Sequence, residues 1–160
     1  LCNRKSLART SSTPGKTQCV NHFLIDGKWY IVDLPGYGFA KLPKKMRENI
    51  DSMIKDYTLN SQELALLFVL LDSRHKLLKN DLEFLTMLGE EGVPFSIIFT
   101  KSDKMGKNAL TSQVEANKAE LLNYWEELPP VFVTSSHTGK GREELLDYIG
   151  KTLTTINNHS

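Results

Sequence analysis

The chain has 160 residues, of which 40% are hydrophobic and 24% are charged, a composition typical of one folded domain. No apolar run reaches the length of a membrane-spanning helix, and residues 1–9 lack the apolar core of a secretion signal, so we expect neither a membrane span nor export. The two cysteines, Cys2 and Cys19, have no metal-ligand spacing. We therefore expect reduced thiols and a cytoplasmic protein.

The net charge of +1 is unevenly distributed along the chain. Residues 1–47 carry nine basic and two acidic side chains, a net charge of +7, so residues 48–160 carry −6. This asymmetry predicts a positive face that meets the phosphates of a nucleotide, of RNA or of both. A solvated face without a partner is the alternative.

Strand-like and helix-like segments alternate along the chain, which predicts an α/β fold with a mostly parallel sheet. The expected strands cover residues 18–25, 28–33, 64–71, 96–99 and 131–134. The expected helices cover residues 43–58, about 78–88, 111–127 and 142–156. We predict a single domain over residues 1–160.

Several of these segments carry more specific predictions. Asp26-Gly27, between the first two strands, predicts a hairpin with a tight turn. The continuous apolar run at 64–71 predicts a strand buried on both faces. In the helix at 111–127, the side chains expected to face the core are Val114, Leu121, Leu122 and Trp125.

Polar residues stand at the carboxyl ends of the expected strands. They are Asp33, Asp72, Thr100 and Thr134. Because ligands bind beyond the carboxyl ends of the strands in such sheets, we expect a ligand site at this edge. At one of these ends, Asp72-Ser73-Arg74 is expected to form a turn with a local Asp–Arg pair, the alternative being a contact near the ligand.

The segment Thr100-Lys101-Ser102-Asp103 has side chains that suit a guanine base. The Asp103 carboxylate can accept hydrogen bonds from the N1–H and N2–H₂ donors of guanine, and the Lys101 stem can lie along the face of the same base. A polar turn between a strand and a helix is the alternative for this segment considered alone.

The segment Asp33-Leu34-Pro35-Gly36 follows an apolar strand end. Asp33 can hold Mg²⁺ through water, and Gly36 allows a backbone N–H to approach a terminal phosphate. A turn that ends the strand is the alternative.

A third polar segment, Thr134-Ser135-Ser136, follows the expected strand at 131–134. A backbone N–H of Ser135 or Ser136 can meet the O6 atom of guanine. A Ser/Thr-rich turn before the last helix is the alternative, but the presence of Lys101 and Asp103 favours the base-binding interpretation.

Taken together, TSSTPGKTQ at 10–18, WYIVDLPGYGFAK at 29–41, TKSD and TSS resemble the EngB/YihA family of ribosome-biogenesis GTPases, which are translation-factor-related P-loop GTPases. The resemblance implies a Ras-like G domain with three α/β/α layers. It also implies a Mg²⁺-dependent GTPase that binds GTP and GDP, acts as a monomer in large-ribosomal-subunit assembly, and is needed for normal cell division and septation.

The resemblance also assigns residues. Thr17 corresponds to the switch I threonine that coordinates Mg²⁺, Asp33 to the water-mediated Mg²⁺ ligand and Gly36 to the γ-phosphate contact. Tyr37 stands where many GTPases have a glutamine that orients the attacking water, so we expect slow turnover. The basic segment after Gly36, with Phe39, Lys41, Lys44, Lys45 and Arg47, is expected to contact ribosomal RNA.

One expected motif, the phosphate cradle GxxxxGK[ST], is not found in the chain. Gly15-Lys16-Thr17 does not provide it, because Thr10 stands where the first glycine is required. We expect that the chain is truncated at its N-terminus and lacks the P-loop and the first, central strand, so that as written it binds nucleotide weakly. The alternative is a nucleotide-free Ras-like module that binds ribosomal RNA or protein.

Overall fold

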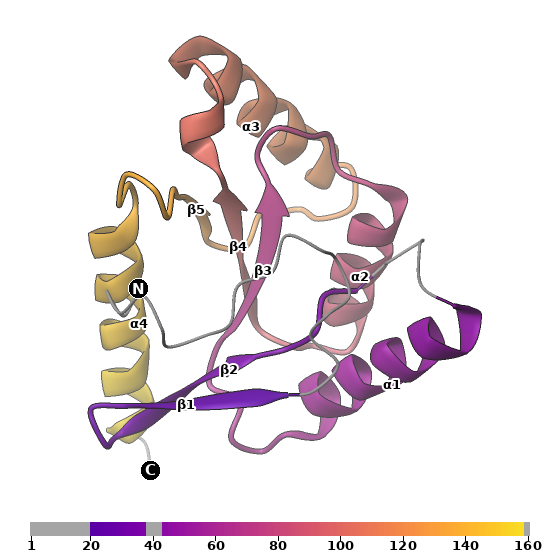
Figure 1. The fold of residues 1–160 in the computed structure, drawn as a ribbon, viewed down its shortest axis with the longest axis vertical. Helices are drawn as coiled ribbons and strands as arrows, with labels where there is room; N and C mark the ends of the chain where they lie inside the picture. The colour runs from indigo at the N-terminus through magenta and orange to yellow at the C-terminus, as the bar shows by residue number, and fades with distance from the viewer. Residues whose placement is uncertain (1–19, 38–42, 159–160) are drawn as a thin grey trace. The chain divides into compact units, whose positions relative to one another are not determined.

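The computed structural model describes residues 20–37 and 43–158. The chain divides into two compact units, Leu1–Ser61 and Gln62–Ser160, and each is described here by itself. Figure 1 labels the helices and strands. Among the described strands, β1 and β2 form one ladder in the first unit, and β3, β4 and β5 form another in the second. The prediction of a single domain over residues 1–160 stays a prediction.

The first unit contains the predicted hairpin. Strands β1 (Asn21–Ile25) and β2 (Trp29–Asp33) pair antiparallel, with Asn21 opposite Asp33. The turn places Asp26 at φ 50° and Gly27 at φ 66°, and the Lys28 N–H closes it on the Ile25 carbonyl at 3.0 Å. Two successive residues with positive φ give a turn whose twist matches that of the strands, which is why Asp-Gly predicts it correctly.

Helix α1 (Lys44–Asn60) follows in the same unit. It begins after Pro43, whose fixed φ and missing N–H suit a helix start. Ile50 and Ile54 are each 3% exposed, and the ring of Tyr57 lies edge-on to that of His22 in β1, with centroids 6.1 Å apart. The buried face of this helix therefore includes Ile50 and Ile54.

The second unit is built on a parallel ladder in the order β3-β4-β5. Its strands are β3 (Leu67–Asp72), β4 (Phe95–Thr100) and β5 (Val131–Val133). In the central strand β4, which contains the predicted strand at 96–99, residues 96–99 are all buried. Asp72 pairs with Thr100 and Phe99 with Val133, so the carboxyl ends of the strands lie level at one edge.

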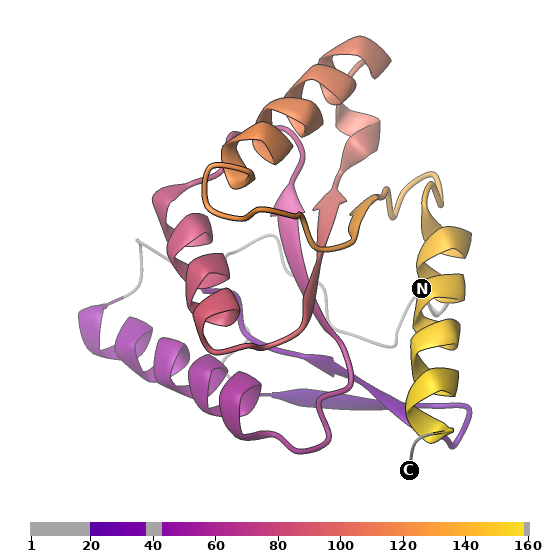
Figure 2. The same ribbon diagram turned by 180° about the vertical axis from the view of Figure 1, so that it is seen from behind.

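Helices cover both faces of this ladder, as Figures 1 and 2 show. Helix α4 (Arg142–Asn157) lies on one face, where its Tyr148 ring contacts Phe132 with centroids 5.1 Å apart. Helices α2 (Lys79–Glu90) and α3 (Lys107–Leu121) lie on the other face. Leu85, Leu88 and Leu121 are fully buried there. This unit thus has the three α/β/α layers that the family resemblance implies.

The prediction of a helix at 111–127 is wrong at both ends, since α3 runs from Lys107 to Leu121. After Leu121 two backbone bonds are of the shorter i→i−3 type: the Asn123 N–H donates to the Glu120 carbonyl and the Tyr124 N–H to the Leu121 carbonyl. Leu122 is 50% exposed and so does not lie in the core, where it was expected. The apolar spacing continues past the true helix end, so spacing alone cannot locate it.

The run at 64–71 also differs from its prediction. Strand β3 begins at Leu67, and only one of its faces is fully buried, because Leu67, Val69 and Leu71 point into the core while Leu70 is 63% exposed. Within the described ladder β3 has a hydrogen-bonded neighbour on one side only. A continuous apolar run does not distinguish such a strand from one covered on both faces.

Candidate functional site

The loops that follow β3, β4 and β5 are joined by backbone hydrogen bonds. The Ser73 N–H donates to the Thr100 carbonyl at 3.0 Å, the Ser102 N–H to the Thr134 carbonyl at 3.1 Å, and the Thr134 N–H to the Phe99 carbonyl at 2.8 Å. These bonds continue the ladder past the strand ends. The structure therefore brings the predicted TKSD and TSS segments together at one edge of the sheet.

Asp103 and Ser135 form the tightest contact at this edge. The short helix η1 (Ser102–Lys104) presents Asp103, whose Oδ1 accepts a hydrogen bond from the Ser135 hydroxyl at 2.6 Å. This bond lowers the pKa of the Asp103 carboxyl, and Lys104, 3.4 Å from Oδ2, lowers it further. The carboxylate is therefore ionised at neutral pH and retains acceptor capacity for donors from a ligand.

The loop after β5 is shaped by the same serine. The Ser135 hydroxyl oxygen accepts hydrogen bonds from the N–H groups of His137 and Thr138, at 3.2 and 3.1 Å. The Ser135 N–H itself donates to the Lys140 carbonyl at 3.1 Å. The Ser136 N–H donates to none of the described residues. Of the two N–H groups considered for a guanine O6, that of Ser136 is thus the one without a partner in the described part of the chain.

Lys101 lies between these loops in an uncommon backbone conformation, with φ 59° and ψ 32°. A non-glycine residue in this left-handed region is a local strain that functional sites often contain. Its Nζ lies 2.9 Å from Oδ2 of Asp72, while its side chain is 53% exposed. The stem of Lys101 is therefore both anchored at its end and accessible to a ligand.

Asp72 also binds Arg74, which confirms the predicted local pair. The guanidinium donates from Nε to Oδ1 at 2.9 Å and from Nη2 to Oδ2 at 2.7 Å. The hydrogen bonds from Arg74 and, after them, that from Lys101 hold the pKa of the Asp72 carboxyl well below its usual range, against the opposing effect of partial burial. Sequence reasoning did not foresee the Lys101 contact, for which the only sequence signal is the placement of both residues at neighbouring strand ends.

The predicted phosphate and Mg²⁺ residues belong to the first unit. Asp33 ends β2, and desolvation raises the pKa of its carboxyl. Among the residues that follow Asp33, Pro35 is buried, Leu34 and Tyr37 are half-buried, and Gly36 is exposed. Thr17 lies outside the described residues, as do Phe39 and Lys41. The Asp33 carboxylate is the hard-oxygen donor type that Mg²⁺ prefers, so this residue suits a water-mediated Mg²⁺ contact.

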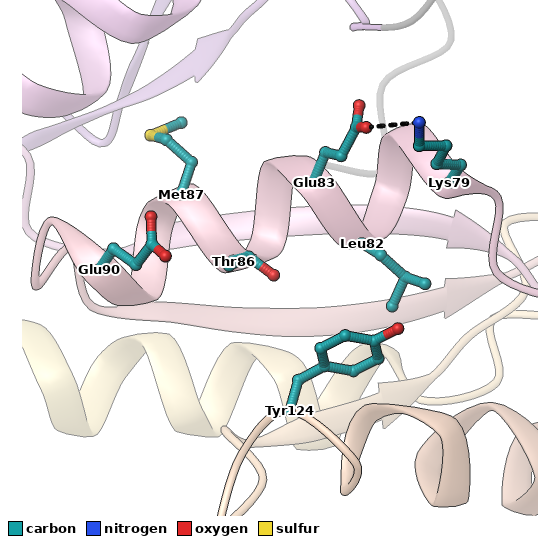
Figure 3. Close-up of a pocket in the computed structure, with 7 residues that line it drawn as sticks. All are labelled: Lys79, Leu82, Glu83, Thr86, Met87, Glu90 and Tyr124. Carbon is teal, nitrogen blue, oxygen red and sulfur yellow. Dashed lines mark ion pairs between the residues drawn. The ribbon is translucent and has the colours of Figure 1, made fainter.

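A shallow depression of about 340 Å³ lies elsewhere in the second unit, along α2 (Figure 3). Its lining includes Leu82, Met87 and Tyr124, with the ion pair of Lys79 and Glu83 at 3.3 Å on its border. It contains none of the residues predicted to bind nucleotide. The described residues include no helix long and apolar enough to cross a membrane, and no group of three or more His, Cys, Asp or Glu placed to hold a metal ion.

Comparisons with known proteins agree on one family. A family model described as 50S ribosome-binding GTPase matches residues 1–101. A probable GTP-binding protein EngB of Porphyromonas gingivalis is 56% identical over 149 residues, which cover 93% of this chain and 74% of that protein. One from Bacteroides fragilis is 53% identical over 149 residues, with the same shares covered.

Solved structures show the same fold. The crystal structure of a probable GTP-binding protein EngB matches with a TM-score of 0.69 at 21% identity, covering 92% of this chain and 86% of that one. Translation elongation factor SelB from Methanococcus maripaludis, solved with a GTP analogue, matches with a TM-score of 0.60 at 20% identity, covering 85% of this chain and 28% of that one. The chain has the α/β Ras-like GTPase fold and belongs to the EngB family of GTP-binding proteins.

Proposed function

We propose that the protein is a Mg²⁺-dependent GTPase that acts in the assembly of the large ribosomal subunit. The observation that carries the nucleotide part is the 2.6 Å hydrogen bond from Ser135 to Asp103, which fixes an ionised carboxylate at the edge where the strands end. Such a carboxylate accepts the N1–H and N2–H₂ groups of guanine, while adenine offers no matching pair of donors. The Ser136 N–H is the proposed donor to O6.

The phosphate end of the nucleotide is assigned to the first unit. Asp33 would hold Mg²⁺ through water together with Thr17, and the ion would neutralise charge on the phosphates. The Gly36 N–H is proposed to donate to the terminal phosphate. Tyr37 has no amide with which to orient a water molecule, so turnover below about 1 s⁻¹ is expected without a partner.

The ribosomal part of the proposal is supported by charge. The family model is described as ribosome-binding, and residues 1–47 of this chain have a net charge of +7. Lys44 and Lys45 are exposed at the start of α1, where they can contact RNA phosphates. The proposed setting is the bacterial cytoplasm, with the protein acting as a monomer, and failure of subunit assembly would be the route to impaired cell division and septation.

Titration of fluorescent GDP and ADP into the full-length protein, with Mg²⁺, tests the nucleotide part. We expect GDP to bind at least about a hundredfold more tightly than ADP, because adenine lacks the two donors that pair with the carboxylate. Equal affinity for the two nucleotides would contradict the proposal.

Sedimentation with large ribosomal subunits tests the second part. Lys44→Glu with Lys45→Glu should weaken binding and reduce the slope of log K against log salt by about 2, because each lysine neutralises about one phosphate. Lys107→Glu with Lys151→Glu is the matched control, since it makes the same charge change at exposed positions of the second unit. If both double variants behave alike, the contact does not lie at α1.

A nucleotide-free module that binds ribosomal RNA or protein remains the second candidate. It is supported by the net charge of +7 over residues 1–47, which suits contact with RNA phosphates whether or not a nucleotide is bound. Subunit binding by the full-length protein without any detectable GDP binding would support this candidate over the first.

A further inference from the structure

The carboxylate of Asp72 is fully engaged by two basic side chains and one backbone group. Arg74 donates to it from Nε, from Nη2 and from its own N–H, the last at 3.1 Å to Oδ1. Lys101, 29 positions further along the chain, donates from Nζ to Oδ2 at 2.9 Å. The side chain of Asp72 is only 22% exposed. Arg74 thus fixes the orientation of the carboxylate to which Lys101 is bound.

The backbone sets the geometry of this pair. Asp72 and Thr100 are partners in the parallel register, and the Ser73 N–H donates to the Thr100 carbonyl beside them. Lys101 follows Thr100 in the left-handed conformation, while the next two residues enter η1, which presents Asp103. Lys101 and Asp103 therefore lie on the same short segment, one bound to Asp72 and the other to Ser135.

We propose that Asp72 is a positioning residue for base binding: it holds the Lys101 ammonium so that the exposed stem of Lys101 is extended where a purine ring can lie along it. This inference rests on the proposed function. A free lysine side chain has many rotamers, and a ligand that packs on it must bear the entropy of ordering them. Because the Lys101 ammonium is already held in the nucleotide-free protein, the side chain has lost this entropy before the ligand binds.

A double-mutant cycle on fluorescent GDP affinity tests the inference in the full-length protein. Asp72→Asn keeps the size of the side chain but removes its charge, and should weaken GDP binding about tenfold. Lys101→Met keeps the apolar stem and removes the ammonium. If Asp72 acts through that ammonium, Asp72→Asn should change the affinity of the Lys101→Met protein by no more than about twofold.

The matched control is Glu83→Gln. It breaks the exposed carboxylate–lysine pair of Glu83 and Lys79 on α2, and should leave GDP affinity within about twofold of the unaltered protein. An equal loss of affinity on Asp72→Asn with and without the Lys101 ammonium, or no loss at all, would overturn the inference and leave the proposed function standing.

A second measurement separates the two claims. NMR carbon relaxation of the Lys101 side chain, without nucleotide, should show restricted motion in the unaltered protein and free motion after Asp72→Asn. A Lys101 side chain that is equally mobile in both proteins overturns the inference. Restricted motion in a protein that fails to bind GDP would overturn the proposed function, and with it the role of Asp72 in base binding.

Discussion

Ser135 donates its hydroxyl to Asp103 at 2.6 Å across 32 positions of sequence, joining the loop after β5 to the loop after β4. Ser135 is 3% exposed, so its hydroxyl is held in place by the packing around it and by the two N–H groups that donate to it. The bond is also the largest cause of the lowered pKa of the Asp103 carboxyl. One buried serine therefore holds the proposed base-reading residue in position and favours its ionised form.

Replacement of Ser135 by alanine should weaken GDP binding about tenfold, because a hydrogen bond to a charged group is typically worth about 1.5–3 kcal/mol and part of it is recovered from water. The pKa of the Asp103 carboxyl should rise toward its ordinary value, which NMR titration can follow. The neighbouring exposed residue gives the control, since Ser136→Ala keeps its backbone N–H and should leave affinity nearly unchanged. Equal losses of affinity in the two variants would assign the effect to the loop as a whole.

Asp103→Asn should change which base is bound. The asparagine amide offers one acceptor and one donor where the carboxylate offers acceptors only, so it opposes the N2–H₂ group of guanine and matches the C2 carbonyl of xanthine. We expect GDP affinity to fall roughly a hundredfold and xanthosine diphosphate to become the preferred ligand. Competition titration of the two nucleotides measures this, and unchanged selectivity for GDP would remove Asp103 from the site.

Alanine substitutions at two glycines near the site distinguish the effect of backbone strain from that of a steric clash. Gly141, which precedes α4, has φ +73°, and a Cβ there would lie 2.5 Å from the Val133 carbonyl oxygen. Gly139 has a similar φ of +78° but open space around it. Gly139→Ala should cost about 1 kcal/mol of unfolding free energy and Gly141→Ala at least about 2 kcal/mol more, measured by urea denaturation. Equal costs would show that strand β5 yields to the added methyl group.

Local patterns predicted most of the elements of this fold. Asp26-Gly27 indicates its hairpin because few residue pairs accept two positive φ angles, and the buried run ending at Phe99 indicates its strand because polar residues are missing from most of it. The end of α3 at Leu121 was not predictable in the same way. It depends on where the chain must turn toward β5, which the apolar spacing of Leu121, Leu122 and Trp125 does not record.

The candidate site was predictable from the sequence to a similar extent. TKSD and TSS could be placed at one edge because parallel strands bring their carboxyl ends together. The bonds from Ser135 to Asp103 and from Lys101 to Asp72 were not foreseen, since each joins side chains from different loops. Such contacts depend on rotamers and on the positive φ of Lys101, which are set by tertiary packing.

Two fully buried serines of the second unit differ in the pairing of their hydroxyls. The Ser96 hydroxyl donates to the Tyr148 hydroxyl at 3.2 Å, while that of Ser73 has no partner among the described residues. Ser96→Ala should lower the unfolding free energy by about 1 kcal/mol, and Ser73→Ala should raise it by a similar amount, because burial of an unpaired hydroxyl is itself unfavourable. Urea denaturation followed by tryptophan fluorescence compares them. Reduced stability in Ser73→Ala would mean that a water molecule or a ligand pairs with that hydroxyl.

The charge on Asp72 should make stability depend on pH in the acid range. Its pKa is lower in the folded chain than the ordinary value of about 3.9 expected when unfolded, so its contribution is fully present above that value and is lost as the pH falls toward the folded pKa. Below about pH 5, the stability of the unaltered protein should therefore fall more steeply than that of Asp72→Asn.

Asp33 should affect the pH dependence of stability in the opposite direction. Its pKa is raised in the folded chain, so its contribution to stability is present at low pH and is lost as the pH rises, and Asp33→Asn should remove this loss. Unfolding free energies measured at several pH values test both differences, and parallel curves for Asp72→Asn and the unaltered protein would show that Arg74 and Lys101 do not hold the charge of Asp72 in solution.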